Sequence, residues 1–509
     1  MLAIELPPEA VADPSRARGL LLLRASDPAL LRKLVDTVNA IQRANGEVAD
    51  VEERTRHGQA YHVRKLVAGP VRRADAYVTF PDGIFAISNS AEAIEQVIDG
   101  KSARADEPES VASRFVSVQQ RLPKRTLARL FVDTAEISRL LKQVRTPRTP
   151  GQVLVEQHLA GMKSAGAALV VDEGRIALEI AEVYDTPGHG HPVADRAGPG
   201  NGGKAPRAGG LPDQALAAAK LRLDFPAIYR MVIGLVPERD RPRLTAMETV
   251  LRGILLGQEL QTRVLPRLGP GVLAFADVIP NWKPKSGQGG ADAGLAEWPF
   301  QLTLVVELND TEAGRTGANP ADPPEVPITA AIENALGTLL GVMALDEQHR
   351  DTPARIMSAQ ANGLTVKHLD RGPAFAFAVD PGCRRVILGT SPAAVSQRAA
   401  ADVGGQARQG INRLRELAFP RAQSFVCIDL SRLRLFFLNH RDAVVEMIAS
   451  QEHRDRDQVA RDLEGAAALA RIFEAVFWSH RFDQGSATSF HTFGLLAGPG
   501  VRHTATPER

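Results

Sequence analysis

The chain repeats one order of sequence features, and this internal repeat limits its possible folds more than any other property of its 509 residues. The best-matched segments are residues 77–100 and 377–405. Each segment predicts a strand, a tight turn, a second strand and then a capped helix. A recurring order of elements indicates a repeated structural unit. We therefore interpret the chain as two related units.

The turns and helix starts of the two segments support this interpretation. The turns are Pro81-Asp82-Gly83 in the first segment and Asp380-Pro381-Gly382 in the second. Both contain the residue types that favour tight turns. The following helices are expected to begin at Asn89 or Ser90 and at Ser391, because these side chains accept hydrogen bonds from the first N–H groups of a helix.

The correspondence continues on both sides of these segments. The further matching pairs are residues 130–134 with 426–430, 18–27 with 301–310, 1–8 with 271–280, and 166–184 with 479–497. Residues 211–268 have no counterpart before Met1. Either the true start lies upstream, together with any export signal, or the first unit begins at an edge strand. We favour truncation, because a missing strand would leave unpaired backbone groups at a sheet edge.

The predicted fold class is α+β, because helices and strands are mixed and tight hairpins favour antiparallel pairing. We expect two tandem related units, each a mainly antiparallel sheet with packed helices. The predicted domains are residues 1–186 (first unit, incomplete at its N-terminus), 187–211 (Gly/Pro-rich linker), 212–497 (second unit) and 498–509 (flexible tail). Residues 283–297 and 311–327 have low complexity, so we interpret them as surface insertions. Residues 28–43 predict an amphipathic helix with an apolar face formed by Leu30, Leu31, Leu34, Val35, Val38 and Ile41.

Composition excludes several classes of function. Lys and Arg total 61 and Asp and Glu total 59, a net charge of +2 without clustering, so no basic patch favours nucleic acid. The longest apolar run, residues 336–345, is about half of the ~20 residues needed to span a bilayer, so no transmembrane segment is expected. Met1 is not followed by a signal-peptide pattern. Cys383 and Cys427 are too few for a disulfide scaffold; we interpret them as free thiols, and whether they pair stays open.

A glycine-rich string and a pair of histidines are the first candidates for chemistry. Residues 198–204 match half of a phosphate-binding loop, but Ala205 stands where Ser or Thr should be, and no strand precedes the string. His189 and His191, with Asp185 nearby, could bind a metal, but lie in the expected linker, so we interpret them as solvated.

The remaining candidates also have structural interpretations. His57 and His62, around Tyr61, are more typical of a strand edge than of a ligand pair. Asp133, Asp224 and Asp429 each end an apolar strand before a helix. Helix capping explains these carboxylates better than catalysis. We therefore predict no catalytic, cofactor-binding or metal-binding residue.

Three segments resemble a bacterial domain-of-unknown-function family, number 3352: FPDGIFAISNSAEAIEQVI (residues 80–98), FVDTAEISRLL (131–141) and LPDQALAAAKLRLDFPAIY (211–229). The resemblance implies a two-copy exported or periplasmic protein of unassigned function and supplies no site residues. The location is then the periplasm or cell envelope if the N-terminus is truncated, and otherwise the cytoplasm.

The leading functional hypothesis is a non-enzymatic scaffold or binding protein of the cell envelope, with a protein, lipid or polymer partner. The alternative is a hydrolase or other enzyme with a site at the cleft between the units, and a third hypothesis is a subunit of a larger assembly. The ligand, any catalytic activity and the oligomeric state cannot be read from the residues.

Overall fold

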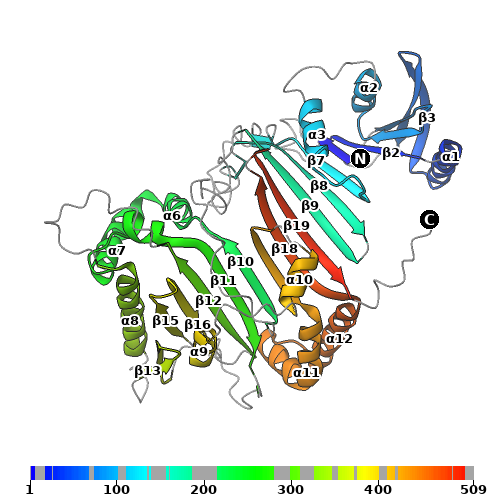
Figure 1. Ribbon diagram of the computed structural model, residues 1–509. Helices are drawn as coiled ribbons and strands as arrows, with labels where there is room; N and C mark the ends of the chain where they lie inside the picture. Colours follow the sequence, from blue (N-terminus) through cyan, green and yellow to red (C-terminus); the bar gives the residue numbers. More distant parts are fainter. Residues whose placement is uncertain are drawn as a thin grey trace. The chain divides into compact units, whose positions relative to one another are not determined.

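The computed structural model describes residues 2–5, 18–25, 27–67, 74–100, 111–134, 137–138, 156, 158–159, 161–172, 174–185, 215–279, 282, 299–309, 326–346, 354–371, 375–400, 410–418, 422–483 and 485–498. The chain is mixed α+β with extensive antiparallel pairing, as predicted (Figure 1). It divides into two compact units. Unit 1 comprises Met1–Val170, Leu178–Gly190 and Gly485–Thr488, and unit 2 comprises Val171–Ala177, His191–Gln484 and Ser489–Arg509.

Unit 1 is a sheet with helices at its face. Its elements are β1 (Leu2–Glu5), β2 (Arg18–Arg24), α1 (Pro28–Ala44), β3 (Val48–Arg56), β4 (Gln59–Leu66), β5 (Ala74–Thr79), β6 (Ile84–Ser88), α2 (Ala91–Gly100), α3 (Val111–Gln119), β7 (Ala128–Val132) and most of β8 (Met162–Asp172) and β9 (Arg175–Tyr184). The strands pair antiparallel in the order β3–β4–β5–β6–β2–β1. β1 then meets β7 in one parallel pair, Leu2 with Leu130, and β7 pairs antiparallel with β8.

Unit 2 contains the larger part of the fold. Its elements are β10 (Ala217–Arg222), α6 (Phe225–Gly234), η3 (Glu238–Asp240), α7 (Arg241–Ile254), η4 (Leu260–Val264), η5 (Leu265–Arg267), β11 (Leu268–Val278), β12 (Phe300–Leu308), α8 (Ile328–Asp346), β13 (Ile356–Ala361), β14 (Leu364–Leu369), β15 (Ala376–Asp380), β16 (Arg385–Gly389), α9 (Pro392–Ala400), α10 (Ile411–Ala418), β17 (Ser424–Asp429), α11 (Leu430–Glu452), α12 (Arg456–Ile472), β18 (Phe473–Asp483) and most of β19 (Thr488–Ala497). The antiparallel order is β13–β14–β15–β16–β12–β11–β10–β17–β18.

The two predicted hairpin turns and the serine caps of the helices that follow them are confirmed. Gly83, in the turn between β5 and β6, has a φ of +81°, a conformation that residues with a side chain rarely adopt. The Ser90 hydroxyl accepts a hydrogen bond from the Ala93 N–H (3.3 Å), and the Ser391 hydroxyl accepts one from the Ala394 N–H (3.0 Å). Each hairpin therefore leads into its helix through a serine cap.

Side chains alternate across the sheet of unit 2 and form a separate core on each face. On β15, Ala376 and Ala378 pack into one core with α9 and α10, whereas Phe377 and Val379 pack into the other with α8. A helix therefore covers each face near β15. Farther along the sheet, the α8 face of β10, β11 and β17 carries the apolar surface described below.

Helix α8 has the length and composition to cross a membrane, and no other described helix does. In unit 2 its Ile328 and Leu340 are fully buried in the core on that face of the sheet. Leu339, Val342 and Leu345 on the same helix are 47%, 57% and 58% exposed. One helix of this length and composition is weak evidence for a membrane span, so it does not contradict the expectation of no transmembrane segment.

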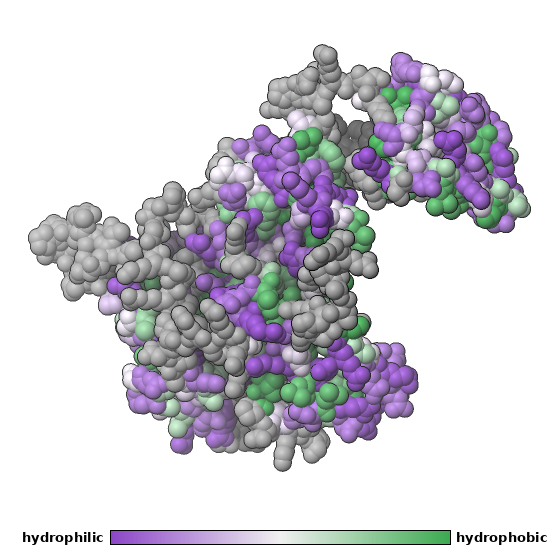
Figure 2. Space-filling view, turned by 45° about the vertical axis from the view of Figure 1, so that its right-hand side comes forward, coloured by the Kyte–Doolittle hydropathy of each residue, from purple (hydrophilic) through white to green (hydrophobic). Residues whose placement is uncertain are grey.

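Helix α1 is amphipathic, as the pattern predicts, but its apolar face is only partly covered within the described residues. Leu30, Leu34, Val38 and Ile41 are 65%, 58%, 41% and 53% exposed. Hydrophobic residues are visible among hydrophilic ones on this part of unit 1 (Figure 2). The sequence pattern therefore gives the apolar face of the helix but not how much of it the sheet covers.

Candidate functional site

Two of the three aspartates singled out from the sequence are helix caps. Asp224 accepts a hydrogen bond from the Ala227 N–H (2.8 Å), and Asp429 accepts one from the Arg432 N–H (3.0 Å). Asp133 forms an ion pair with Arg114, whose Nη2 lies 2.7 Å from Asp133 Oδ2. The residues that Asp133 would cap first lie outside the described part of the chain, so its capping role stays a prediction.

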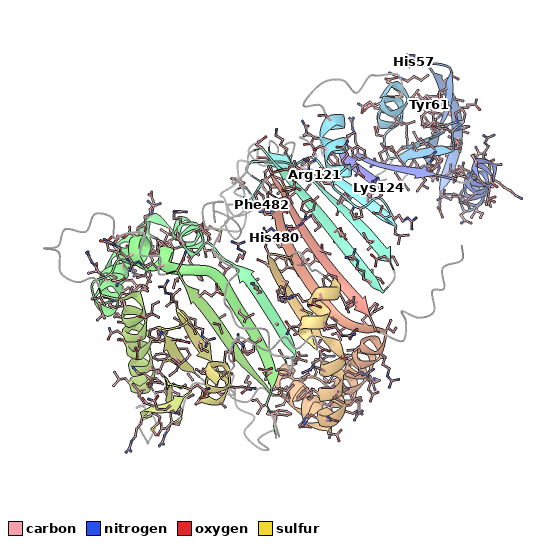
Figure 3. The ribbon with its side chains drawn as sticks, in the orientation of Figure 1. His57, Tyr61, Arg121, Lys124, His480 and Phe482 are labelled. Atoms are coloured by element: carbon pink, nitrogen blue, oxygen red, sulfur yellow. The ribbon has the colours of Figure 1, made fainter. Side chains whose placement is uncertain are left out.

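The histidine candidates are not brought together. His57 has a φ of 50° in the two-residue turn between β3 and β4, and its Nε2 lies 3.2 Å from Asp99 (Figure 3). His62 lies on β4, where its ring stacks on Tyr77 at 4.8 Å. Asp185 pairs with Lys163 at 2.9 Å. His189, His191 and residues 198–204 lie outside the described residues.

The cysteines are free thiols in different environments: Cys383 is exposed and Cys427 is fully buried. Burial, with a smaller contribution from Asp429, raises the pKa of the Cys427 thiol to about 12. No group of three or more His, Cys, Asp or Glu residues suited to a metal occurs within the described ranges. The histidines, cysteines and aspartates singled out from the sequence are therefore not gathered into a metal site within these ranges.

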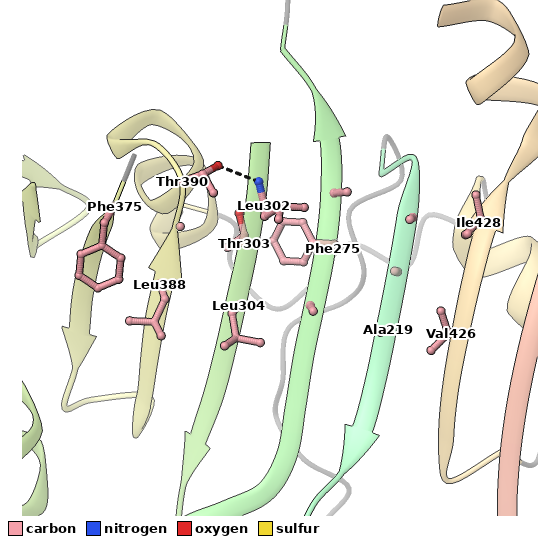
Figure 4. A pocket seen from close by; sticks show the side chains of 15 residues that line it. Ala219, Phe275, Leu302, Thr303, Leu304, Phe375, Leu388, Thr390, Val426 and Ile428 are labelled. Atoms are coloured by element: carbon pink, nitrogen blue, oxygen red, sulfur yellow. Dashed lines mark hydrogen bonds between the residues drawn. The ribbon is translucent and has the colours of Figure 1, made fainter. Parts of the chain in front are cut away.

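Unit 2 has a cavity in the form of an apolar basin on the α8 face of the sheet (Figure 4). Its floor consists of four half-buried alanines on β10 and β11: Ala217, Ala219, Ala274 and Ala276. The register explains this floor, because Ala217 pairs with Ala276 and Ala219 pairs with Ala274. Small side chains lie opposite one another on two adjacent strands and leave a depression.

Larger side chains on the flanking strands form the walls of this basin. Leu302 and Leu304 rise from β12 on one side, and Val426 and Ile428 rise from β17 on the other. Strands in a sheet lie about 4.8 Å apart, so the three steps from β12 to β17 place the walls roughly 14 Å apart. The cavity holds about 560 Å³, within the range of small-molecule sites.

The basin is lined by almost no polar side chains. Its two hydroxyl side chains belong to Thr303 and Thr390, and Thr390 Oγ1 already accepts a hydrogen bond from the Leu302 N–H (2.9 Å, dashed in Figure 4). None of its lining residues is titratable. On the core side of the same strands, burial lowers the pKa of Lys220 and raises the pKa of Asp277. The lining is therefore suited to bind an apolar group.

The sequence contains a signal for this basin. The strand residues 217–219 are three consecutive alanines, and alanine recurs at positions 274 and 276 of the partner strand. Alternating alanines on two paired strands predict a shallow face. Only the register, however, places the two alanine sets opposite each other.

Comparison with known proteins assigns no family: no family model, no curated protein and no solved structure matches the chain. The function must therefore be argued from the basin and from the internal organisation of the units.

Proposed function

We propose that this chain is a non-enzymatic binding protein of the bacterial cell envelope, and that the basin of unit 2 holds a lipid acyl chain. The observation that carries the proposal is the basin itself, with its alanine floor and its leucine, valine and isoleucine walls. Apolar surface that stays in water costs roughly 25 cal/mol per Å². An acyl chain in the basin would remove this surface from water and would need no charged partner.

We further propose that the two units are copies of one α+β unit. The order β3–β4–β5–β6–β2–β1 in unit 1 has the same connections as β13–β14–β15–β16–β12–β11 in unit 2. In unit 2, β10 lies between β11 and β17, whereas β1 pairs directly with β7 in unit 1. This difference fits a first copy that lacks the strand equivalent to β10.

The envelope location rests on the resemblance to the exported family and on the ligand class, since lipids are constituents of the envelope. Fractionation of cells that express the full-length gene product tests it: recovery in the periplasm or with membranes is expected. Recovery in the cytoplasm alone would contradict the location but would leave the basin proposal untouched.

Titration with saturated fatty acids of increasing chain length tests the basin. Burial of one methylene contributes about 0.8 kcal/mol, and an open basin covers roughly half of the chain, so four added methylenes should tighten binding about tenfold until the basin is full. Trp478 reports binding, because it is the cross-strand neighbour of the wall residue Val426. Failure of the protein to bind any chain length would refute the proposal.

Bulky substitutions on the floor provide the site-specific control. Ala219→Phe and Ala276→Phe should each weaken binding at least tenfold, because the ring fills the depression. Ala359→Phe, on the exposed strand β13, adds the same bulk away from the basin and should bind as the parent does. Equal affinities for all three variants would show that the ligand binds elsewhere. Circular dichroism confirms that each variant is folded.

A further inference from the structure

Unit 1 contains a second cavity, of different chemistry, between helix α3 and the ends of β8 and β9. Its volume is about 380 Å³. Its polar lining consists of Ser113, Arg114 and Ser117 on α3, Lys163 and Ser164 on β8, and Asp185 after β9. This lining combines cations with hydroxyl groups, so the cavity is suited to a polar ligand.

Two cations of this cavity are held in place by carboxylates. Arg114 Nη2 lies 2.7 Å from Asp133 Oδ2, and both side chains are less than a fifth exposed. Lys163 Nζ lies 2.9 Å from Asp185 Oδ1, where the Asp185 side chain is 56% exposed. Asp133 thus holds Arg114 in place in the wall of the cavity. The second pair is at the rim, where a ligand can compete for the lysine.

Two hydroxyl groups in the cavity can donate hydrogen bonds. Ser117 Oγ accepts a hydrogen bond from Arg121 Nη1 (2.6 Å), which leaves its own proton for another acceptor. Arg121 follows helix α3 and is labelled in Figure 3. Ser164 is 1% exposed, and its hydroxyl forms no hydrogen bond within the described part of the chain. A buried hydroxyl without a partner costs free energy, so a ligand that accepts from Ser164 would recover it.

The strand positions of this cavity carry different residues in unit 2. The equivalent positions follow from the strand pairing. In unit 1, Val132 of β7 pairs with Ala165 of β8, and in unit 2 the corresponding Ile428 of β17 pairs with Val476 of β18. By this alignment Lys163 corresponds to Glu474, and Ser164 corresponds to Ala475. Ala475 is 1% exposed in the core of unit 2, so the fold accepts alanine at this position.

The helix position also differs. Ser117 stands as many residues before Asp133 as Arg413 stands before Asp429. In unit 2 the Arg413 and Glu474 side chains form an ion pair. Unit 1 has the short Ser117 in place of the arginine and the positive Lys163 in place of the glutamate. The cavity therefore lies where unit 2 has an ion pair, and the charge of the strand residue is reversed.

We propose that this cavity binds a phosphomonoester, with Lys163 and Arg114 supplying positive charge and Ser117 and Ser164 donating hydrogen bonds. The donors come from a helix on one side and a strand on the other, which matches a tetrahedral anion with acceptors in several directions. The volume exceeds that of one phosphate group and leaves room for a small polar substituent. The phosphomonoester is either a free metabolite or the headgroup of a phospholipid.

Calorimetric titration of the full chain tests the proposal at constant ionic strength. The probes are inorganic phosphate, glycerol 3-phosphate and vesicles that contain phosphatidic acid, with chloride as the control. Saturable binding of the soluble probes identifies a free phosphomonoester, and binding of the vesicles alone identifies a headgroup. If chloride binds with the same affinity as phosphate, or if none of the probes binds, the proposal is wrong.

Substitutions that introduce the residues of unit 2 at the equivalent positions of unit 1 distinguish a binding role of the cavity from a purely structural role. Ser164→Ala should weaken phosphate binding about tenfold or more and should leave the melting temperature equal or higher, because the unpartnered hydroxyl is gone. The double variant Ser117→Arg with Lys163→Glu restores the ion pair of unit 2 and should abolish binding. Ser88→Ala is the matched control, because it also removes a serine hydroxyl that is almost fully buried in unit 1 (3% exposed), at a position that does not line the cavity.

The outcomes distinguish the two roles. Loss of phosphate affinity in Ser164→Ala, together with unchanged affinity in Ser88→Ala, supports the site. Unchanged affinity in Ser164→Ala would overturn it, even if the double variant fails to fold.

Discussion

Asp380 and Arg385 form a buried ion pair beside the turn between β15 and β16, and replacing Asp380 with Ala should destabilise unit 2 by about 3–5 kcal/mol. Arg385 Nε lies 3.0 Å from Asp380 Oδ2, and the two side chains are 7% and 9% exposed. Asp380 Oδ1 also accepts a hydrogen bond from the Cys383 N–H (2.9 Å). Burial raises the pKa of Asp380, but the Cys383 N–H and Arg385 outweigh it, so its pKa lies below the ordinary value.

The magnitude follows from what the substitution leaves behind. Without the carboxylate, the Arg385 guanidinium stays in a site with little access to water. Its charge also acts on Arg398, whose pKa is lowered to about 10 by burial and by Arg385. Exposed ion pairs contribute only about 0–1 kcal/mol, but both partners here are almost fully buried, so little of their interaction is screened.

Urea unfolding followed by tryptophan fluorescence measures this effect in unit 2, because all three tryptophans lie between residues 282 and 478. The double variant Asp380→Ala with Arg385→Met removes both charges and should cost less than the sum of the single variants. If Asp380→Ala cost less than about 1 kcal/mol, or if the two substitutions were additive, the reasoning would be wrong. The pKa of Asp380 is lowered in the folded protein, so the native protein should be more stable to unfolding than Asp380→Asn. This difference in stability should be complete above about pH 5 and should be lost as the pH falls through the lowered pKa.

Three further predictions concern single groups. A thiol reagent should label only Cys383 in the native protein and also Cys427 after unfolding, because burial keeps the second thiol protonated and covered; counting released chromophore checks this. The nearby Glu182 raises the pKa of His158, so His158→Gln should cost stability below about pH 6.5 and less as the pH rises through the raised value. The effect should be small, since the His158 side chain is 39% exposed; melting curves from pH 6 to pH 8 measure it. Gly166→Ala should lower the melting temperature of unit 1, because the added Cβ would overlap a side chain of α3.

The local features of the fold could be predicted from the sequence because their hydrogen bonds join neighbouring residues. Ser90, Ser391, Asp224 and Asp429 each accept from an N–H group three residues later. Such contacts depend on residue type and spacing alone, and both are visible in the sequence. The α+β class could be predicted for the same reason, since hairpin turns and helix caps recur along the chain.

The two candidate sites could not be predicted, because each depends on residues that only the folded sheet brings together. The alanines of the basin belong to strands about fifty residues apart in sequence, and Ala219 meets Ala274 only in the observed register. The ion pair of Asp133 with Arg114 likewise joins a strand end to a helix. The sequence predicts the helix that follows Asp133 but not that Arg114 lies beside its carboxylate.

The two candidate sites lie where the proposed copies differ, and this gives a reason to expect binding at both. At one equivalent buried position, unit 1 has Ser164 and unit 2 has Ala475. The fold accepts either residue there, so the fold alone does not require the serine. The basin needs β10, which supplies half of its floor and has no equivalent between β1 and β7. Conversely, the polar cavity needs Ser117 and Lys163, because an arginine and a glutamate at these positions would fill and neutralise it, as in unit 2. If both proposals hold, one scaffold binds an apolar chain in one copy and a phosphate group in the other, and a floor variant such as Ala219→Phe should leave phosphate affinity unchanged.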